Sequence, residues 1–297
     1  MRGVRYPRPD WRALAARIDK TSPKNKDAAW SDAAAQWLGE ICEAAGGKYG
    51  TDRSKHFIVM SALDKRAATS VLEFAERARR AIHRALTGLA NTGGFGLHAI
   101  LVFETEDEYY EYIAPYYPEG HYAVSAGVYL NEGYGHLVVP RREPGLLEPV
   151  LAHELAHALL SHLPLPRWLD EGVAVNLESV LCPRSARRLE VDWIGRHQRW
   201  WNRKSVQLYW SGHAFHVPGK LSELSYELAW VWVRSLAEDY EAFRAFALEA
   251  SSDDAGQASA IKHLGGRLGH QFEALLGEGN WDPDPSQWER DAQANAA

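Results

Sequence analysis

Cysteine is scarce in this chain, which has only Cys42 and Cys182 among its 297 residues. The two form neither a CxxC pair nor the kind of framework that holds disulfide-rich secreted domains together. We therefore expect two buried thiols in a reducing compartment.

Long apolar runs are also missing. No window of 18 or more residues is apolar throughout, so we expect no membrane-spanning segment and no membrane partner. The first ten residues carry positive charge, but no apolar stretch follows them, which predicts that no secretory signal is present. Together with the cysteine usage, these absences favour a cytoplasmic protein.

A surplus of positive charge is absent too. The formal net charge is −6, which gives no electrostatic basis for a nucleic-acid partner. One stretch is locally basic and interleaved with tryptophan, and its members are Arg184, Arg187, Arg188, Trp193, Arg196, Arg199, Trp200, Trp201, Arg203 and Lys204. Because Glu190 and Asp192 interrupt it, we interpret this stretch as an amphipathic helix with a solvated basic face.

The rest of the composition is ordinary for a globular protein, with 46% hydrophobic and 24% charged residues. The length suits one large domain or two small ones. Twelve Trp and 13 Tyr are many for this length, and they indicate a large aromatic core or an aromatic-lined cleft.

The most informative stretch is HELAH, residues 153–157. On a helix, His153 and His157 lie one turn apart on the same face, so both imidazoles can bind one zinc ion at about 2.0–2.1 Å. Glu154 flanks the metal and can hold and deprotonate a zinc-bound water, whose pKa the ion lowers to roughly 7. Apolar residues surround the motif, which predicts a mostly buried helix whose polar groups, Glu148 included, need partners.

A catalytic zinc takes three protein ligands, and the next predicted helix offers the third. This helix begins at Pro166 and reads RWLDEGVAVNLE over residues 167–178. Asp170 and Glu171 compete for the role. Glu171 has the longer reach and precedes Gly172, whose missing side chain would let this helix approach the HELAH helix closely.

HELAH followed by RWLDEGVAVNLE resembles the gluzincin clan of zinc metallopeptidases, and more narrowly the bacterial peptidase MA-like proteins. It is also similar to the WLNEGFA segment of the aminopeptidase-N-like family. The resemblance implies a zincin-like α+β fold, zinc as cofactor, His153, His157 and Glu171 as ligands, and Glu154 as the general base.

The chain departs from the larger members of the clan in three places. Only 13 residues separate His157 from Glu171, which fits the compact MA-like proteins. Val175 stands where thermolysin-like members place an Asp. Glu178, one turn further, is either a partner for an imidazole or part of a solvated helix face. Residues 127–132, GVYLNE, match the GxMEN motif of aminopeptidases poorly, which favours an endopeptidase or an enzyme with a narrow substrate.

Upstream, the order of a strand at residues 56–60, a helix at 67–89 and a strand at 97–103 resembles the lead-in of MA-like peptidases. Thr105 and Glu108 form a capping box that predicts a helix through residue 113. Alternating residues then predict two strands, 122–129 and 134–139, joined by a turn at 131–133. We expect one strand of this hairpin to edge the cleft and to receive a peptide substrate.

The oxyanion of the transition state needs a donor from outside the HELAH helix. Aminopeptidase-N-like enzymes present a Tyr several dozen residues after the ligand Glu, and the resemblance points to Tyr226, for which a core position is the alternative. His213 and His216 lie in a glycine-containing loop and either line a pocket, are solvated or cap a helix. The other histidines near the motif, His121, His136 and His162, read as core or surface residues.

Three segments follow: an N-terminal helical segment, 1–50; a zincin-like core with a small mixed sheet, 51–182; and a mainly helical C-terminal subdomain, 183–297. In the last we expect helices at 224–237, 239–249 and 256–275, and a loop or frayed tail after Gly277. The sequence leaves the oligomeric state open.

Two function classes remain. The first is a zinc metallopeptidase acting on a peptide or protein, with hydrolysis of a non-peptide amide as a variant. The second is a catalytically silent, zinc-binding scaffold on a peptidase-like fold. Glu154 favours the enzyme, because a structural zinc needs no base and typically has a fourth protein ligand.

Overall fold

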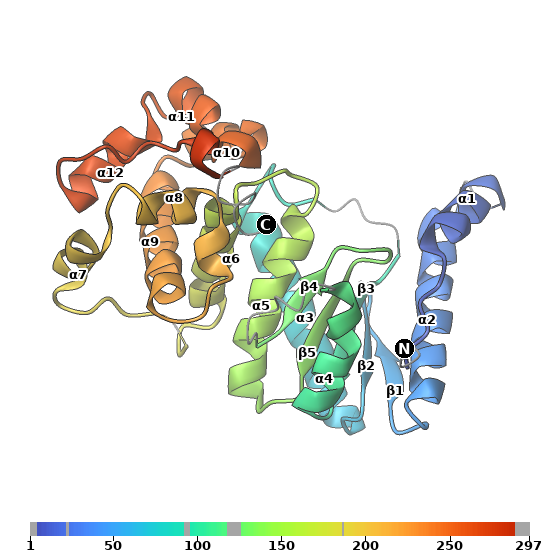
Figure 1. The fold of residues 1–297 in the computed structure, drawn as a ribbon. Helices are drawn as coiled ribbons and strands as arrows, with labels where there is room; N and C mark the ends of the chain where they lie inside the picture. The colour runs from blue at the N-terminus through green and yellow to red at the C-terminus, as the bar shows by residue number, and fades with distance from the viewer. Residues whose placement is uncertain (1–4, 22–23, 92–95, 118–125, 186, 289–297) are drawn as a thin grey trace, which may run out of the picture. The chain divides into compact units, whose positions relative to one another are not determined.

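The computed structural model describes residues 5–21, 24–91, 96–117, 126–185 and 187–288 (Figure 1). The chain forms two compact units. We call residues 1–159 with 181–185 the sheet unit, and residues 160–180 with 186–297 the helical unit. These limits differ from the boundaries predicted after residues 50 and 182, which stay predictions.

The sheet unit is built on a mixed sheet of five strands in the order β1-β2-β3-β5-β4. The strands are β1 (Gly50–Arg53), β2 (Phe57–Ser61), β3 (His98–Phe103), β4 (Val128–Leu130) and β5 (His136–Pro140). The three central strands, β2, β3 and β5, run parallel, and β1 and β4 pair antiparallel at the two edges. The central strands are buried along almost their whole length, as is usual for parallel strands covered on both faces. β5 is buried at every position, although its sequence was interpreted as alternating.

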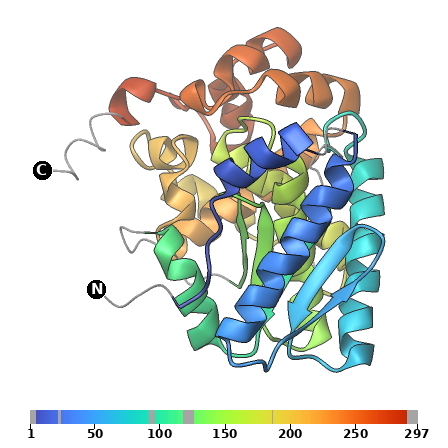
Figure 2. The ribbon, with the colours of Figure 1, turned by 90° about the vertical axis from the view of Figure 1, so that its right-hand side faces the viewer.

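Helices cover both faces of this sheet, with α3 behind it and α4 in front in Figure 1. They are α1 (Trp11–Thr21), α2 (Lys26–Ala44), α3 (Lys65–Ala85), α4 (Glu106–Ile113) with the 3-10 turn η1 (Ala114–Tyr116), and α5 (Pro144–Leu160). Figure 2 shows α2 running across the sheet. Trp37 and Ile41 of α2 and Tyr112 of α4 share one apolar cluster with β2, β3 and β5, so α2 and α4 cover the same face.

The start of α4 shows how local sequence sets these helices. The Thr105 hydroxyl accepts a hydrogen bond from the backbone N–H of Glu108 at 3.2 Å, and it donates to the Glu108 carboxylate. The predicted cap is thus present. At α3, Asp64 plays the same part by accepting from the N–H of Ala67.

The helical unit contains α helices and two 3-10 turns in its described part. They are α6 (Arg167–Leu181), α7 (Trp193–Trp200), α8 (Ser205–Trp210), η2 (His213–Phe215), α9 (Lys220–Leu236), α10 (Tyr240–Glu249), η3 (Ser252–Asp254), α11 (Gln257–His263) and α12 (Leu268–Leu276). Its core is aromatic, with Trp168 stacked on Trp232 at a centroid distance of 4.7 Å and Phe272 against Trp232 at 3.9 Å. The many tryptophans therefore serve largely as core here.

Three expectations need correction or limitation. The single helix predicted over 256–275 is two helices, because Gly265 has φ +75° and ends the helical path between α11 and α12. The tail after Gly277 is packed: Trp281 is buried, and its carbonyl accepts a hydrogen bond from Trp210 Nε1 at 2.8 Å. The strand predicted over 122–129 begins outside the described residues, and β4 covers its end.

The observed architecture confirms the coarse class, a mixed α and β protein with a small mixed sheet and a mainly helical C-terminal part. Cys42 and Cys182 are both buried and belong to no disulfide. Among the described helices, none has the length together with the apolar character that crossing a bilayer requires.

Candidate metal centre

Helix α5 presents the two histidines of HELAH. It begins at Pro144, which suits a first helical turn because proline lacks the N–H that would go unpaired there. His153 and His157 follow on consecutive turns, and their ring centroids lie 4.8 Å apart. The i, i+4 spacing thus places both imidazoles on one face, as the sequence predicted.

Helix α6 presents Glu171. The helix is buried along most of its first three turns, and the Trp168 indole fixes the first turn by donating to the carbonyl of Ala255 at 3.0 Å. Glu171 is 1% exposed. A carboxylate this deeply buried is costly unless charged or hydrogen-bonding groups compensate it.

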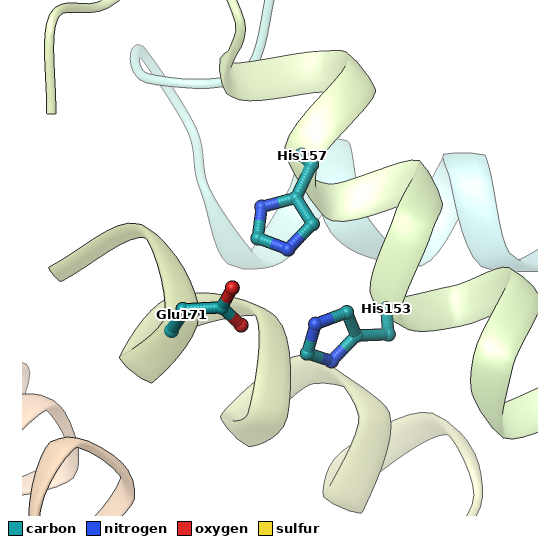
Figure 3. Close-up of side chains that lie close together, drawn as sticks. All are labelled: His153, His157 and Glu171. Carbon is teal, nitrogen blue, oxygen red and sulfur yellow. The ribbon is translucent and has the colours of Figure 1, made fainter. Parts of the chain in front are cut away.

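His153, His157 and Glu171 lie together, with their potential ligand atoms all within 4.8 Å of one another (Figure 3). Within the described ranges, no other group of three His, Cys, Asp or Glu side chains meets this spacing. Two imidazoles and one carboxylate are a donor set that zinc takes in catalytic sites, where a fourth position stays open. The residues present therefore fit a zinc ion.

The structure separates the two acids that competed for the third position. Glu171 belongs to the cluster, whereas Asp170, its neighbour on α6, is half-buried and does not. Successive helical residues point about 100° apart, so only one of two adjacent side chains can face the histidines.

Glu154 is buried beside the two histidines on α5 but is not one of the clustered residues. Its Oε2 accepts a hydrogen bond from the backbone N–H of Tyr129 at 2.7 Å. Tyr129 lies in β4, the edge strand of the sheet. A backbone donor on a paired strand is rigid, so it fixes the direction of this carboxylate, and no sequence pattern signals such a contact.

Arg167 is the residue that the sequence reading missed. Its Nη2 lies 2.6 Å from Oε1 of Glu171, one turn further along α6. Oppositely charged residues at i and i+4 of a helix are neighbours, so this spacing could have predicted the pair.

Tyr226 lies on α9, with its ring 5.2 Å from that of Phe215 and the Arg187 guanidinium 5.6 Å from its centre. These contacts assign it neither to the metal cluster nor to a fully buried core position, so its role as oxyanion donor stays a prediction. His213 and His216 are both exposed. Partial desolvation of its ring lowers the pKa of His216, the positive charge of Arg167 lowers it further, and Glu171 opposes this. His216, which directly follows the η2 turn, thus feels the charges of the first turns of α6.

The sequence left open whether His136 is a core or a surface residue, and the structure shows that it is a core residue. It is 1% exposed on β5, its Nδ1 lies 2.6 Å from the carbonyl of Tyr134, and its Nε2 lies 2.8 Å from the Tyr112 hydroxyl. Both ring nitrogens of His136 therefore have hydrogen-bond partners within the sheet unit. His162 is exposed, and His121 lies outside the described residues.

Comparison of the sequence with models of known protein families gives no match, and comparison with curated proteins gives none either. The case for a function therefore rests on the motif residues and on their geometry.

Proposed function

We propose that this protein is a zinc-dependent metallopeptidase of gluzincin type on a zincin-like fold. The observation that carries the proposal is the convergence of His153, His157 and Glu171 within 4.8 Å, with Glu154 buried next to the first of them in sequence. The resemblance to MA-like peptidases in HELAH and RWLDEG supports the same conclusion.

The three clustered residues would hold the ion. Zinc, when bound, supplies Lewis acidity that polarises a carbonyl and makes water more acidic. Glu154 accepts the proton of the attacking water and passes it to the nitrogen of the departing amine. The N–H of Tyr129 keeps the Glu154 carboxylate oriented for this transfer.

The substrate we propose is a peptide or protein. The sequence left open which strand of the hairpin edges the cleft, and β4 is the one at the edge of the sheet, because β5 lies between β3 and β4. An extended peptide can add to such an edge through main-chain hydrogen bonds. A cytoplasmic location without nucleic-acid or membrane partners stays part of the proposal.

The experiment is a metal and activity measurement on four proteins: the wild type, Glu171→Ala, Glu154→Gln and Glu148→Gln. Glu148 lies on the same helix but outside the cluster, so it controls for the loss of one negative charge from α5. We expect about one zinc per chain by plasma mass spectrometry in all but Glu171→Ala. On a fluorogenic peptide library, Glu154→Gln should lose a factor of about 10²–10⁴ in rate, the usual worth of a general base.

Each outcome separates the alternatives. Zinc in the wild type without hydrolysis of any peptide would favour the silent scaffold. Hydrolysis that survives Glu154→Gln would remove the proposed base. A wild type that takes up no zinc, even after incubation with the ion, would refute the proposed function altogether.

A further inference from the structure

The ion pair between Arg167 and Glu171 joins a half-exposed cation to a buried anion. The Arg167 side chain is 40% exposed and the Glu171 side chain 1% exposed. Exposed pairs contribute little because solvent screens them, but a buried carboxylate that loses its partner is strongly destabilised. The guanidinium is therefore a substantial part of the environment of Glu171.

The base of the Arg167 side chain is closely packed. Gly212 has φ +82°, and a Cβ atom added to it would lie 2.7 Å from Cβ of Arg167. The backbone at Gly212, just before the η2 turn, thus packs directly on the base of this side chain, where only glycine fits. Trp168, the next residue of α6, is fully buried and hydrogen-bonded.

The Glu171 side chain has three rotatable bonds, so its carboxylate has no fixed direction of its own. A carboxylate can bind a metal with fixed geometry only if its own rotamer is fixed, and groups that hydrogen-bond to metal ligands commonly do this. A guanidinium suits the task better than an ammonium, because its planar donor fork has a defined orientation and stays charged at every relevant pH.

We propose that Arg167 is a positioning residue of the metal centre: it holds one oxygen of Glu171 and so keeps the carboxylate directed toward His153 and His157. The inference rests on the proposed function, since it assigns a role within that metal site. It places Arg167 outside the set of ligands and outside the reacting groups. A merely stabilising ion pair would affect folding but not the affinity for zinc.

The test compares Arg167→Lys and Arg167→Met with the wild type and with Arg244→Met. Arg244 forms an exposed i, i+3 pair with Glu241 at 2.7 Å on α10, so its loss changes the net charge equally without touching Glu171. Zinc affinity is measured by competition with a chromophoric chelator. The absorption spectrum of the cobalt-substituted protein reports the ligand geometry independently of activity.

We expect a zinc affinity about 10–100-fold weaker in Arg167→Met, a smaller loss in Arg167→Lys, and a changed cobalt spectrum in both. Arg244→Met should match the wild type. Arg167→Lys keeps the charge and most of the stem, so it tests the idea even if Arg167→Met does not fold.

Two results would overturn the inference and leave the proposed function standing. One is unchanged zinc affinity with an unchanged cobalt spectrum in a folded Arg167→Lys protein. The other is tighter zinc binding in the variants. It would mean that the guanidinium only repels the zinc cation and does not position Glu171. Absence of zinc in the wild type would overturn the proposed function and this inference with it.

Discussion

Gly172, the residue after the candidate ligand Glu171, offers a prediction that the packing of the helical unit makes quantitative. A Cβ atom at this position would lie 2.5 Å from Cγ2 of Val233 and 2.8 Å from the carbonyl oxygen of Ala229, both on α9. Real Cβ atoms do not approach so closely, and the backbone oxygen cannot rotate away. Gly172→Ala must therefore push α6 and α9 apart.

Two opposing effects set the magnitude. Replacing glycine by alanine inside a helix gains about 1 kcal/mol in helix propensity. Forcing a methyl group into a well-packed interface costs about 1–3 kcal/mol, and the backbone contact places this case at the upper end. We expect a net loss of about 1–2 kcal/mol in the free energy of unfolding. Because Glu171 moves with its neighbour, zinc affinity should fall as well.

Urea denaturation measures this loss, and Gly39→Ala is the matched control. Gly39 lies inside α2, and a Cβ atom added there meets nothing within 4 Å, so the same substitution should stabilise by up to about 1 kcal/mol. The reasoning is refuted if Gly172→Ala proves as stable as the wild type, because helix propensity would then outweigh the close approach of α9.

Two further predictions concern the cores. Burial lowers the pKa of His136 from its ordinary value of 6.5 to about 4. Between those values the unfolded chain binds a proton that the folded protein does not, so the free energy of unfolding should fall as the pH drops from 6.5 to 4. For this fully buried group the loss amounts to about 3 kcal/mol, and urea titrations of His136→Phe should show a flatter pH dependence; equal slopes would argue against the assignment. Trp281→Ala should cost about 3–5 kcal/mol in the same assay, because it empties a buried aromatic position, whereas a change near zero would mean that the segment after Gly277 adds nothing to the fold.

The elements that sequence predicted well are those whose signal is local. HELAH lies on a helix, the Thr105 cap is made, and the strands expected at 56–60 and 97–103 are present as β2 and β3. Each depends on residues within one or two turns, or on the burial of an entire strand, and such patterns survive any tertiary arrangement.

The elements that sequence reasoning missed depend on distant partners. β1 was not predicted, because it is a short polar edge strand, mostly exposed, and is defined only by its pairing with β2. The sequence suggested that Gly172 allows α6 to approach the HELAH helix, but the nearest atoms belong to α9. The tail was predicted to be a loop or frayed, and its proline-rich sequence does not reveal that Gln207 and Trp210 hydrogen-bond to it.

The candidate site divides in the same way. The sequence by itself determined that His153 and His157 share a helical face and that Glu154 stands beside them, because helical geometry fixes neighbours over a single turn. Only the tertiary structure showed that Glu171 and not Asp170 lies with the two histidines, that the N–H of Tyr129 in the edge strand donates to Glu154, and that Gly212 packs on the base of Arg167. These contacts join residues far apart in the chain or choose between adjacent ones, and the packing of complete helices and strands is what selects them.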